Sequence, residues 1–157
     1  VKIRAAAKRR HIAVSFGMIE RRSGSLYSTQ LFIGADGEIV NVFHRVSPGW
    51  KDRSQTDGHY REGARFEKFS YGGKTFAVGL CGDLWTEGRP EEMKALQADV
   101  VLWPVWCDYS PAEWNAAVKY EYAQLTPPPR TAPQALAFIF GTAPSCGSFP
   151  PADRGPC

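Results

Sequence analysis

The chain has 157 residues, of which 43% are hydrophobic and 13% aromatic; this is enough for one domain with a substantial core and argues against wholesale disorder. Its formal net charge is only +3, so electrostatics gives no reason to expect a nucleic-acid or membrane partner. No stretch approaches the length of a membrane span, and the N-terminus lacks the apolar core of a signal peptide. These features predict a cytoplasmic protein.

Basic residues gather at the start of the chain, where Glu20 is the only acidic residue among the first 22. Such a cluster is compatible with a targeting peptide or a polyanion-binding arm. The favoured interpretation is the solvated face of a helix at a domain edge. The cluster consists of Lys2, Arg4, Lys8, Arg9, Arg10, Arg21 and Arg22.

The four cysteines lie at wide, unequal spacings that match no zinc-binding pattern. In a chain without a secretion signal, we expect them to be free thiols rather than disulfide partners. They are Cys81, Cys107, Cys146 and Cys157.

The first part of the chain predicts a helix followed by strands. Residues 1–10 are rich in alanine with charged flanks, as in a helix, and a chain that starts with valine inside an element indicates a fragment. Residues 11–20 and 23–34 are strand-like, and an Asp-Gly turn before residues 39–43 is typical of a hairpin. Residues 47–65 are polar and rich in turn formers, which predicts a long loop of the kind that borders a site.

The second part alternates strands and helices. Residues 66–81 predict two strands joined through a Gly-Gly turn, and residues 89–98 carry the proline and acidic residues of a first helical turn. Residues 99–106 predict a short buried strand. A capping box then opens a helix over residues 111–124, which the triple proline at 127–129 ends. This order predicts a layered α/β domain.

The last segment, residues 125–157, differs in composition from the rest. It holds eight of the twelve prolines, and only the run "ALAFIF" offers a further strand. We therefore predict one domain over residues 1–124 and an atypical, Pro-rich, disordered segment over residues 125–157.

The stretch "KTFAVGLCGDLW" places Cys81 at the end of a predicted buried strand. A cysteine in this position is usually structural, because cysteine is among the most buried residue types. In open α/β sheets, however, ligands gather at the carboxyl ends of strands, where backbone N–H groups are also free. Cys81 is therefore a candidate nucleophile, and the N–H of Gly82 a candidate donor to a developing oxyanion.

A cysteine nucleophile needs a base and a positive group near it. Glu20 ends a predicted strand and is one candidate base, with a solvated turn residue as the alternative interpretation. A Cys-His pair is the other arrangement that the residues leave open. The histidines that could form it are His11, His44 and His59.

Three blocks of the sequence, in this order, resemble the nitrilase superfamily of carbon-nitrogen hydrolases. They read "GMIERRSGSLYSTQLFIGADGEIVNVFHRV", "FAVGLCGDLW" and "ALQADVVLWPVW". The resemblance implies an α/β fold, namely part of a four-layer α-β-β-α sandwich whose first strand and helix would precede Val1. It also implies hydrolysis of an amide, carbamoyl group or nitrile of a small molecule, without a metal or organic cofactor.

Carried over residue by residue, the resemblance implies that Glu20 is the general base and Cys81 the nucleophile, at intervals that look normal for the family. The position of the family's catalytic lysine is occupied by Arg45, with His44 before it. Arginine keeps the positive charge but is too weakly acidic to give up a proton. Lys51, in the same predicted loop, is an alternative source of a lysine.

The resemblance also suggests supporting roles for other residues. Asp83 is expected to hold the turn after the cysteine by accepting backbone hydrogen bonds. Three residues are expected to line the pocket, with ordinary core packing as the alternative: Trp103, Pro104 and Trp106. A second glutamate of the family has no clear counterpart, because only Asp52 is acidic in that region.

Family members commonly form dimers through the two helices that follow the cysteine strand and the next one. The resemblance therefore implies a homodimer through helices near residues 89–97 and 111–124. The alternative to an enzyme is a catalytically inactive relative that binds a small molecule or a protein.

Overall fold

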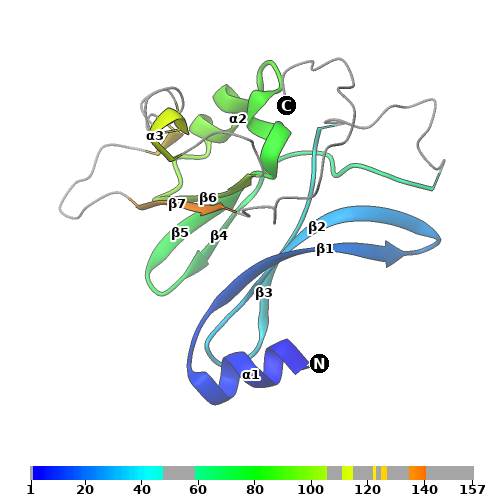
Figure 1. The fold of residues 1–157 in the computed structure, drawn as a ribbon, viewed down its shortest axis with the longest axis vertical. Helices are drawn as coiled ribbons and strands as arrows, with labels where there is room; N and C mark the ends of the chain where they lie inside the picture. The colour runs from blue at the N-terminus through cyan, green and yellow to red at the C-terminus, as the bar shows by residue number, and fades with distance from the viewer. Residues whose placement is uncertain are drawn as a thin grey trace.

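The computed structural model describes residues 2–47, 59–105, 111–114, 122, 125–126 and 135–140 (Figure 1). Two sheets and several short helices make up this part of the chain. The elements are α1 (Lys2–Arg10), β1 (Val14–Arg22), β2 (Ser25–Ile33), β3 (Ile39–His44), β4 (Lys68–Tyr71), β5 (Lys74–Val78), the 3₁₀-helix η1 (Cys81–Trp85), α2 (Arg89–Ala95), β6 (Val100–Val105), α3 (Pro111–Trp114) and β7 (Ala135–Phe140).

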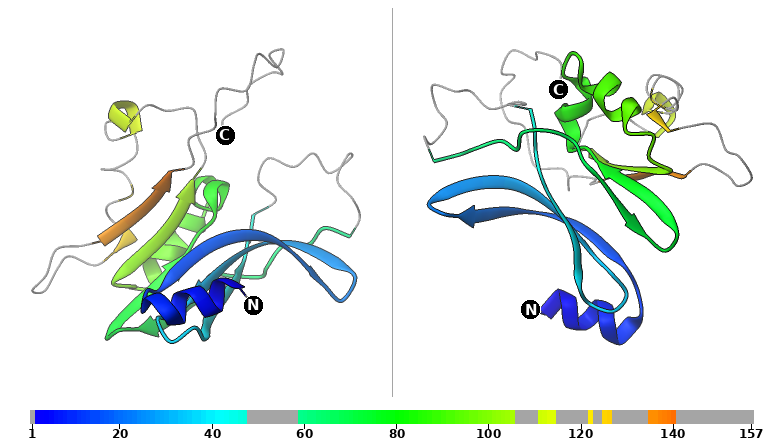
Figure 2. Two further views of the ribbon diagram at one scale, coloured as in Figure 1. Left: turned by 60° about the horizontal axis from the view of Figure 1, so that its bottom comes forward. Right: turned by 180° about the vertical axis from the view of Figure 1, so that it is seen from behind.

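The first sheet is an antiparallel meander in the order β1-β2-β3. Ser23 and Gly24 join β1 to β2 with positive φ angles of 49° and 80°, as a tight turn matched to strand twist requires. Helix α1 lies beside this sheet against the β2–β3 turn, where Arg4 Nε donates to the carbonyl of Gly37 over 2.7 Å (Figure 2).

The second sheet has the order β4-β5-β6-β7. β4 and β5 form the predicted hairpin through Gly72 and Gly73, both at positive φ, and β5, β6 and β7 run parallel. The predicted strand "ALAFIF" is confirmed as β7, which pairs along the whole of β6. The carboxyl ends of the parallel strands share one edge of this sheet, and the chain reaches Cys81 shortly after it leaves β5.

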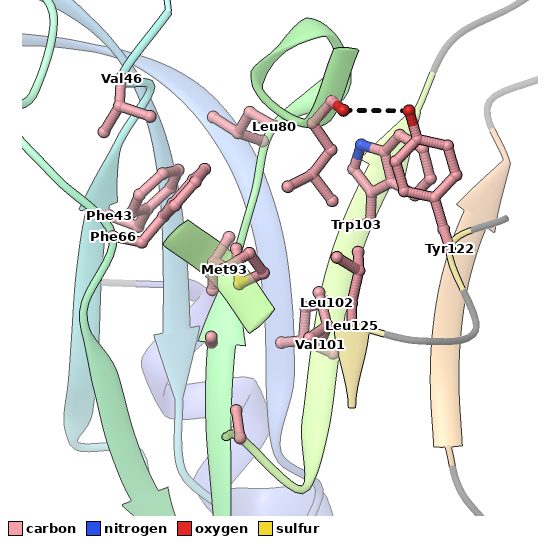
Figure 3. Close-up of a cluster of buried hydrophobic side chains, with 14 of the residues drawn as sticks. Phe43, Val46, Phe66, Leu80, Met93, Val101, Leu102, Trp103, Tyr122 and Leu125 are labelled. Carbon is pink, nitrogen blue, oxygen red and sulfur yellow. Dashed lines mark hydrogen bonds between the residues drawn. The ribbon is translucent and has the colours of Figure 1, made fainter. Parts of the chain in front are cut away.

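The two sheets contact each other through aromatic side chains. The ring of Phe32 on β2 lies 5.0 Å from Phe69, 5.1 Å from Tyr71 and 5.5 Å from Phe76, measured between ring centroids. Figure 3 shows the core continuing from Phe43 past Met93 of α2, which is fully buried, toward β6. One hydrophobic core therefore joins both sheets and α2.

The predicted mixed α/β class is confirmed, whereas the full four-layer sandwich stays a prediction. Of the two helices expected to form a dimer, α2 is present, while most of the predicted helix over residues 111–124 lies outside the described residues. Within the described ranges, no helix is long and apolar enough to cross a membrane. Trp106, Cys107, Lys51 and Asp52 also lie outside them, as does most of the predicted loop.

Candidate active site

Cys81 is the first residue of η1 and sits in an unusual backbone conformation. Its φ angle is 45°, in the left-handed region that residues other than glycine rarely adopt. The strand β5 ends at Val78 rather than at the cysteine, because the chain leaves the ladder to form this turn. Strained residues at a strand-to-helix turn are a feature of nucleophile sites, where the turn exposes the side chain.

Three hydrogen bonds hold the turn around Cys81. The backbone N–H of Leu80 donates to Asp83 Oδ2 over 2.8 Å, and the N–H of Asp83 donates back to the carbonyl of Leu80 over 2.9 Å. From β6, Trp103 Nε1 donates to the carbonyl of Cys81 over 2.9 Å. The half-buried thiol is thus carried by a backbone fixed on both sides.

The carboxylate of Asp83 links this turn to the segment that follows β3. Asp83 is 0% exposed, and its Oδ1 accepts from the backbone N–H groups of Val46 over 3.2 Å and Ser47 over 2.9 Å, and from Ser47 Oγ over 2.6 Å. Burial raises the pKa of Asp83, against the opposing effect of the hydrogen bonds from Ser47 and Leu80. These are the backbone contacts expected of Asp83 from the sequence.

Arg45 lies in the same buried cluster, with 7% of its surface exposed. Its Nε donates to Ser47 Oγ over 3.4 Å and lies 3.9 Å from Asp83 Oδ1. Within the described ranges, its Nη2 is buried without a hydrogen-bond partner. A buried guanidinium with an unpaired donor can receive an oxygen atom of a ligand, which makes Arg45 a candidate for binding a substrate oxygen.

Glu20 has a different set of partners. Its Oε2 accepts from Thr29 Oγ1 over 3.0 Å and lies 2.7 Å from His44 Nε2, and the ring of Tyr27 lies 4.4 Å from the ring of His44. The pKa of Glu20 is lowered, first by the hydrogen bond with His44, with burial opposing this effect. Glu20 therefore contacts the residue directly before Arg45.

The remaining predicted residues support the turn or the core. Trp103 is 0% exposed and its ring packs against Tyr122 (Figure 3) and against Trp85, so its bulk belongs to the core rather than to an open pocket wall. Gly82 is buried, and its carbonyl accepts from Thr86 Oγ1 over 2.8 Å. Pro104 is half-buried on β6.

Ser47 is a member of the site that the sequence did not reveal. Ser47 carried no signal, because its neighbours in the chain do not reveal that it meets Asp83. The contact between Glu20 and His44 follows from strand register, since Glu20 pairs with Tyr27 and Thr29 pairs with His44 across the first sheet. Among the described residues, no group of three or more His, Cys, Asp or Glu side chains is arranged to hold a metal ion.

The indole of Trp103 gives a first prediction. Trp103→Phe removes the donor to the Cys81 carbonyl together with part of a fully buried ring, so it should lower the free energy of unfolding by more than the about 1 kcal/mol of the hydrogen bond and change the rate at which iodoacetamide alkylates Cys81. Urea unfolding and mass spectrometry measure the two effects. The matched control is Tyr71→Phe, which loses a hydrogen bond to the Ala35 N–H far from the turn; an equal change of alkylation rate in both variants would contradict the role of Trp103.

The family profile described as carbon-nitrogen hydrolase matches residues 1–121. The chain belongs to the carbon-nitrogen hydrolase family. An amidase of the nitrilase superfamily from Nesterenkonia AN1, solved as a cysteine-to-alanine mutant, shares the fold with a TM-score of 0.62 at 17% identity, over 78% of this chain and 46% of that one. A carbon-nitrogen hydrolase from Helicobacter pylori G27 gives a TM-score of 0.58 at 17% identity, over 78% and 42% of the two chains.

A relative at higher identity is an aliphatic nitrilase from Rhodococcus rhodochrous. It is 47% identical over 49 residues, which make up 31% of this chain and 13% of the nitrilase. The chain thus matches less than half the length of each of these relatives. These structural likenesses show the fold of this carbon-nitrogen hydrolase chain.

Another of the Nesterenkonia structures shows a reaction at the cysteine of that amidase. It is a glutamate mutant with the acetamide moiety of fluoroacetamide added covalently at the active-site cysteine. The role of Glu20 as base stays a prediction.

Proposed function

We propose that this chain carries the nucleophile of a hydrolase that cleaves a non-peptide carbon-nitrogen bond in a small amide, carbamoyl compound or nitrile. The observation that carries the proposal is Cys81 itself: a half-buried thiol at positive φ, on a turn that Asp83 ties to the Arg45 segment. Membership of the carbon-nitrogen hydrolase family supports it.

In the proposed reaction on an amide, the thiolate of Cys81 attacks the carbonyl carbon and a sulfur–carbon bond forms. The negative charge that develops on the carbonyl oxygen is stabilised by the guanidinium of Arg45 and the N–H of Gly82. The carbon–nitrogen bond then breaks, and ammonia or an amine leaves with a proton to give a thioester. Water attacks the thioester, releases the acid and returns the proton to the thiol.

Glu20 is the proposed base that takes the proton from Cys81 and later activates water. Two observations support an ionised carboxylate there: its lowered pKa and its contacts with Thr29 and His44. An ionised base of this kind contributes about 100-fold or more to turnover.

Glu20→Gln should therefore lower kcat by about 100-fold, with the purified chain still folded. Because the pKa of Glu20 is lowered, its ionised form and the stability that it contributes should persist below the pH at which an unfolded glutamate takes up a proton. Both should be lost as the pH falls through this lowered pKa, which pH profiles of activity and of urea unfolding measure. Full activity in Glu20→Gln, with Glu38→Gln as an exposed control, would exclude Glu20 as the base.

The general experiment is to measure ammonia release across a panel of small amides, carbamoyl compounds and nitriles. The proposal expects turnover of at least one of these classes and selective alkylation of Cys81. Absence of both would favour the second candidate function, a catalytically inactive relative that binds a small molecule or a protein. The specific observation behind that candidate is Arg45, which occupies the position where the resemblance implies a proton-donating lysine.

A Cys-His hydrolase would show a different pattern in the same assay. His44 is engaged with Glu20 over 2.7 Å, which favours a role for His44 at Glu20 rather than at Cys81. Activity that is lost in a His44 or His59 variant and retained in Glu20→Gln would nevertheless identify such an enzyme.

A further inference from the structure

Ser47 lies between the two charged side chains of the site. It is 1% exposed, and its Oγ is 2.6 Å from Asp83 Oδ1 and 3.4 Å from Arg45 Nε. A hydroxyl has one proton to donate and lone pairs to accept with, whereas a guanidinium only donates and an ionised carboxylate only accepts. The hydrogen bonds therefore run in one direction, from Arg45 to Ser47 and from Ser47 to Asp83.

The Ser47 hydroxyl connects Arg45 to the carboxylate, because no direct hydrogen bond between Arg45 and Asp83 is present in the described part of the chain. The 3.9 Å between Arg45 Nε and Asp83 Oδ1 is beyond hydrogen-bond range, and the same oxygen already accepts two backbone N–H groups and the Ser47 hydroxyl. A guanidinium is planar, so a contact at Nε also fixes where its other nitrogens point.

The other edge of the Arg45 guanidinium differs from the Nε edge in its hydrogen bonding. In the part of the chain that the structure describes, Nη2 of Arg45 is buried and has no hydrogen-bond partner. Leaving a charged donor buried and unpaired is costly, so such a group marks a place where a ligand atom completes the site. A substrate oxygen that gains negative charge during the reaction would accept the missing hydrogen bond from Nη2 of Arg45.

We propose that Ser47 is a positioning residue of this site: its hydroxyl holds Arg45 by Nε, which keeps Nη2 available for the oxygen of the substrate. The inference rests on the proposed function, and it adds a residue to which neither the family resemblance nor the comparisons give a role.

The identity of the cation sharpens the proposal. Lysine ends in a single ammonium group and has no counterpart of the arginine Nε, so a lysine at position 45 would not use the Ser47 hydroxyl in this way. Ser47 should therefore matter only while position 45 is arginine. Two residues that act as one unit show this as a non-additive double-mutant cycle.

The test compares Ser47→Ala, Ser47→Thr, Arg45→Lys and the double variant Arg45→Lys/Ser47→Ala on the best substrate of the panel. Ser47→Ala should lower kcat by about 100-fold with a smaller change in KM, because a misplaced group costs about that much. Ser47→Thr keeps the hydroxyl and should restore most of the rate. In the Arg45→Lys background, Ser47→Ala should cause no further loss.

A second measurement does not need turnover. The side-chain Nε–H signal of Arg45 in a ¹⁵N NMR spectrum, assigned by its absence in Arg45→Lys, should exchange slowly with water in the unchanged chain and in Ser47→Thr. It should exchange fast in Ser47→Ala. Ser15→Ala is the control, because it removes a serine hydroxyl that donates to the Leu31 carbonyl over 3.1 Å on the first sheet.

The outcomes separate this proposal from the proposed function. If no substrate is turned over but the Arg45 signal responds only to Ser47→Ala, the proposed function fails and the coupling of Ser47 to Arg45 stands. If turnover is found but the losses in the double-mutant cycle add, or the Arg45 signal is unchanged in Ser47→Ala, the positioning role of Ser47 is overturned.

Discussion

Cys81→Ala is expected to abolish turnover while leaving the chain folded. The proposed reaction passes through a bond to the sulfur of Cys81, and removal of a covalent nucleophile typically lowers kcat by a thousand-fold or more, to about the level that binding alone supports. The fold should survive, because the thiol is half-buried and the bonds that hold the turn come from the Leu80 N–H, the Asp83 N–H and the Trp103 indole. Ammonia release and circular dichroism measure the two properties.

The other cysteines provide an internal control for Cys81. Iodoacetamide at limiting concentration should label Cys81 before Cys107, Cys146 and Cys157, because in the proposed reaction Cys81 is the cysteine that acts as the nucleophile. Peptide mass spectrometry reports each site separately in the unchanged chain and in Cys81→Ala. Turnover that persists in Cys81→Ala would end the proposal of a covalent mechanism at this residue.

The strands of this chain were predictable from local chemistry. Two hairpins have turns whose residues adopt positive φ. These residues are Ser23 and Gly24 between β1 and β2, and Gly72 and Gly73 between β4 and β5. Apolar residues around these turns specify strands on both sides, and the proline of α2 lies in its first turn as expected. Local signals of this kind require no knowledge of what lies opposite in space.

The contacts that build the candidate site could not be predicted in the same way. Ser47 and Asp83 are 36 residues apart in the chain, and Glu20 and His44 are 24 apart, so no local periodicity links either pair. Cys81 and Arg45 could be identified from the motifs around them. These motifs indicate a protein family but do not show which side chains meet in the folded chain. The packing of the two sheets and η1 determines which acceptor lies next to a buried donor.

Asp83→Ala should have the largest effect on stability of any single change at the site. It would leave the buried guanidinium of Arg45 without its carboxylate and would remove the acceptor of the N–H groups of Val46, Ser47 and Leu80. Breaking a buried ion pair by deleting one partner costs about 3–5 kcal/mol. That is a large part of the stability of an ordinary domain, so urea unfolding should shift to much lower concentrations or the variant should fail to fold.

Asp83→Asn tests the same contacts when the alanine variant does not fold, because asparagine keeps the shape and one acceptor oxygen and should lose less stability. Asp83→Asn also removes the ionisable carboxyl group. Burial raises the pKa of Asp83, so the folded chain holds the proton of this carboxyl group more tightly than the unfolded chain does. The corresponding stability is present at low pH and is lost as the pH rises through the raised pKa, and Asp83→Asn should lack this step.

The surface control is Glu67→Ala, whose ion pair with Arg65 is exposed and should contribute at most about 1 kcal/mol. If Asp83→Ala were no more destabilising than Glu67→Ala, the carboxylate would not be what joins the Cys81 turn to the Arg45 segment.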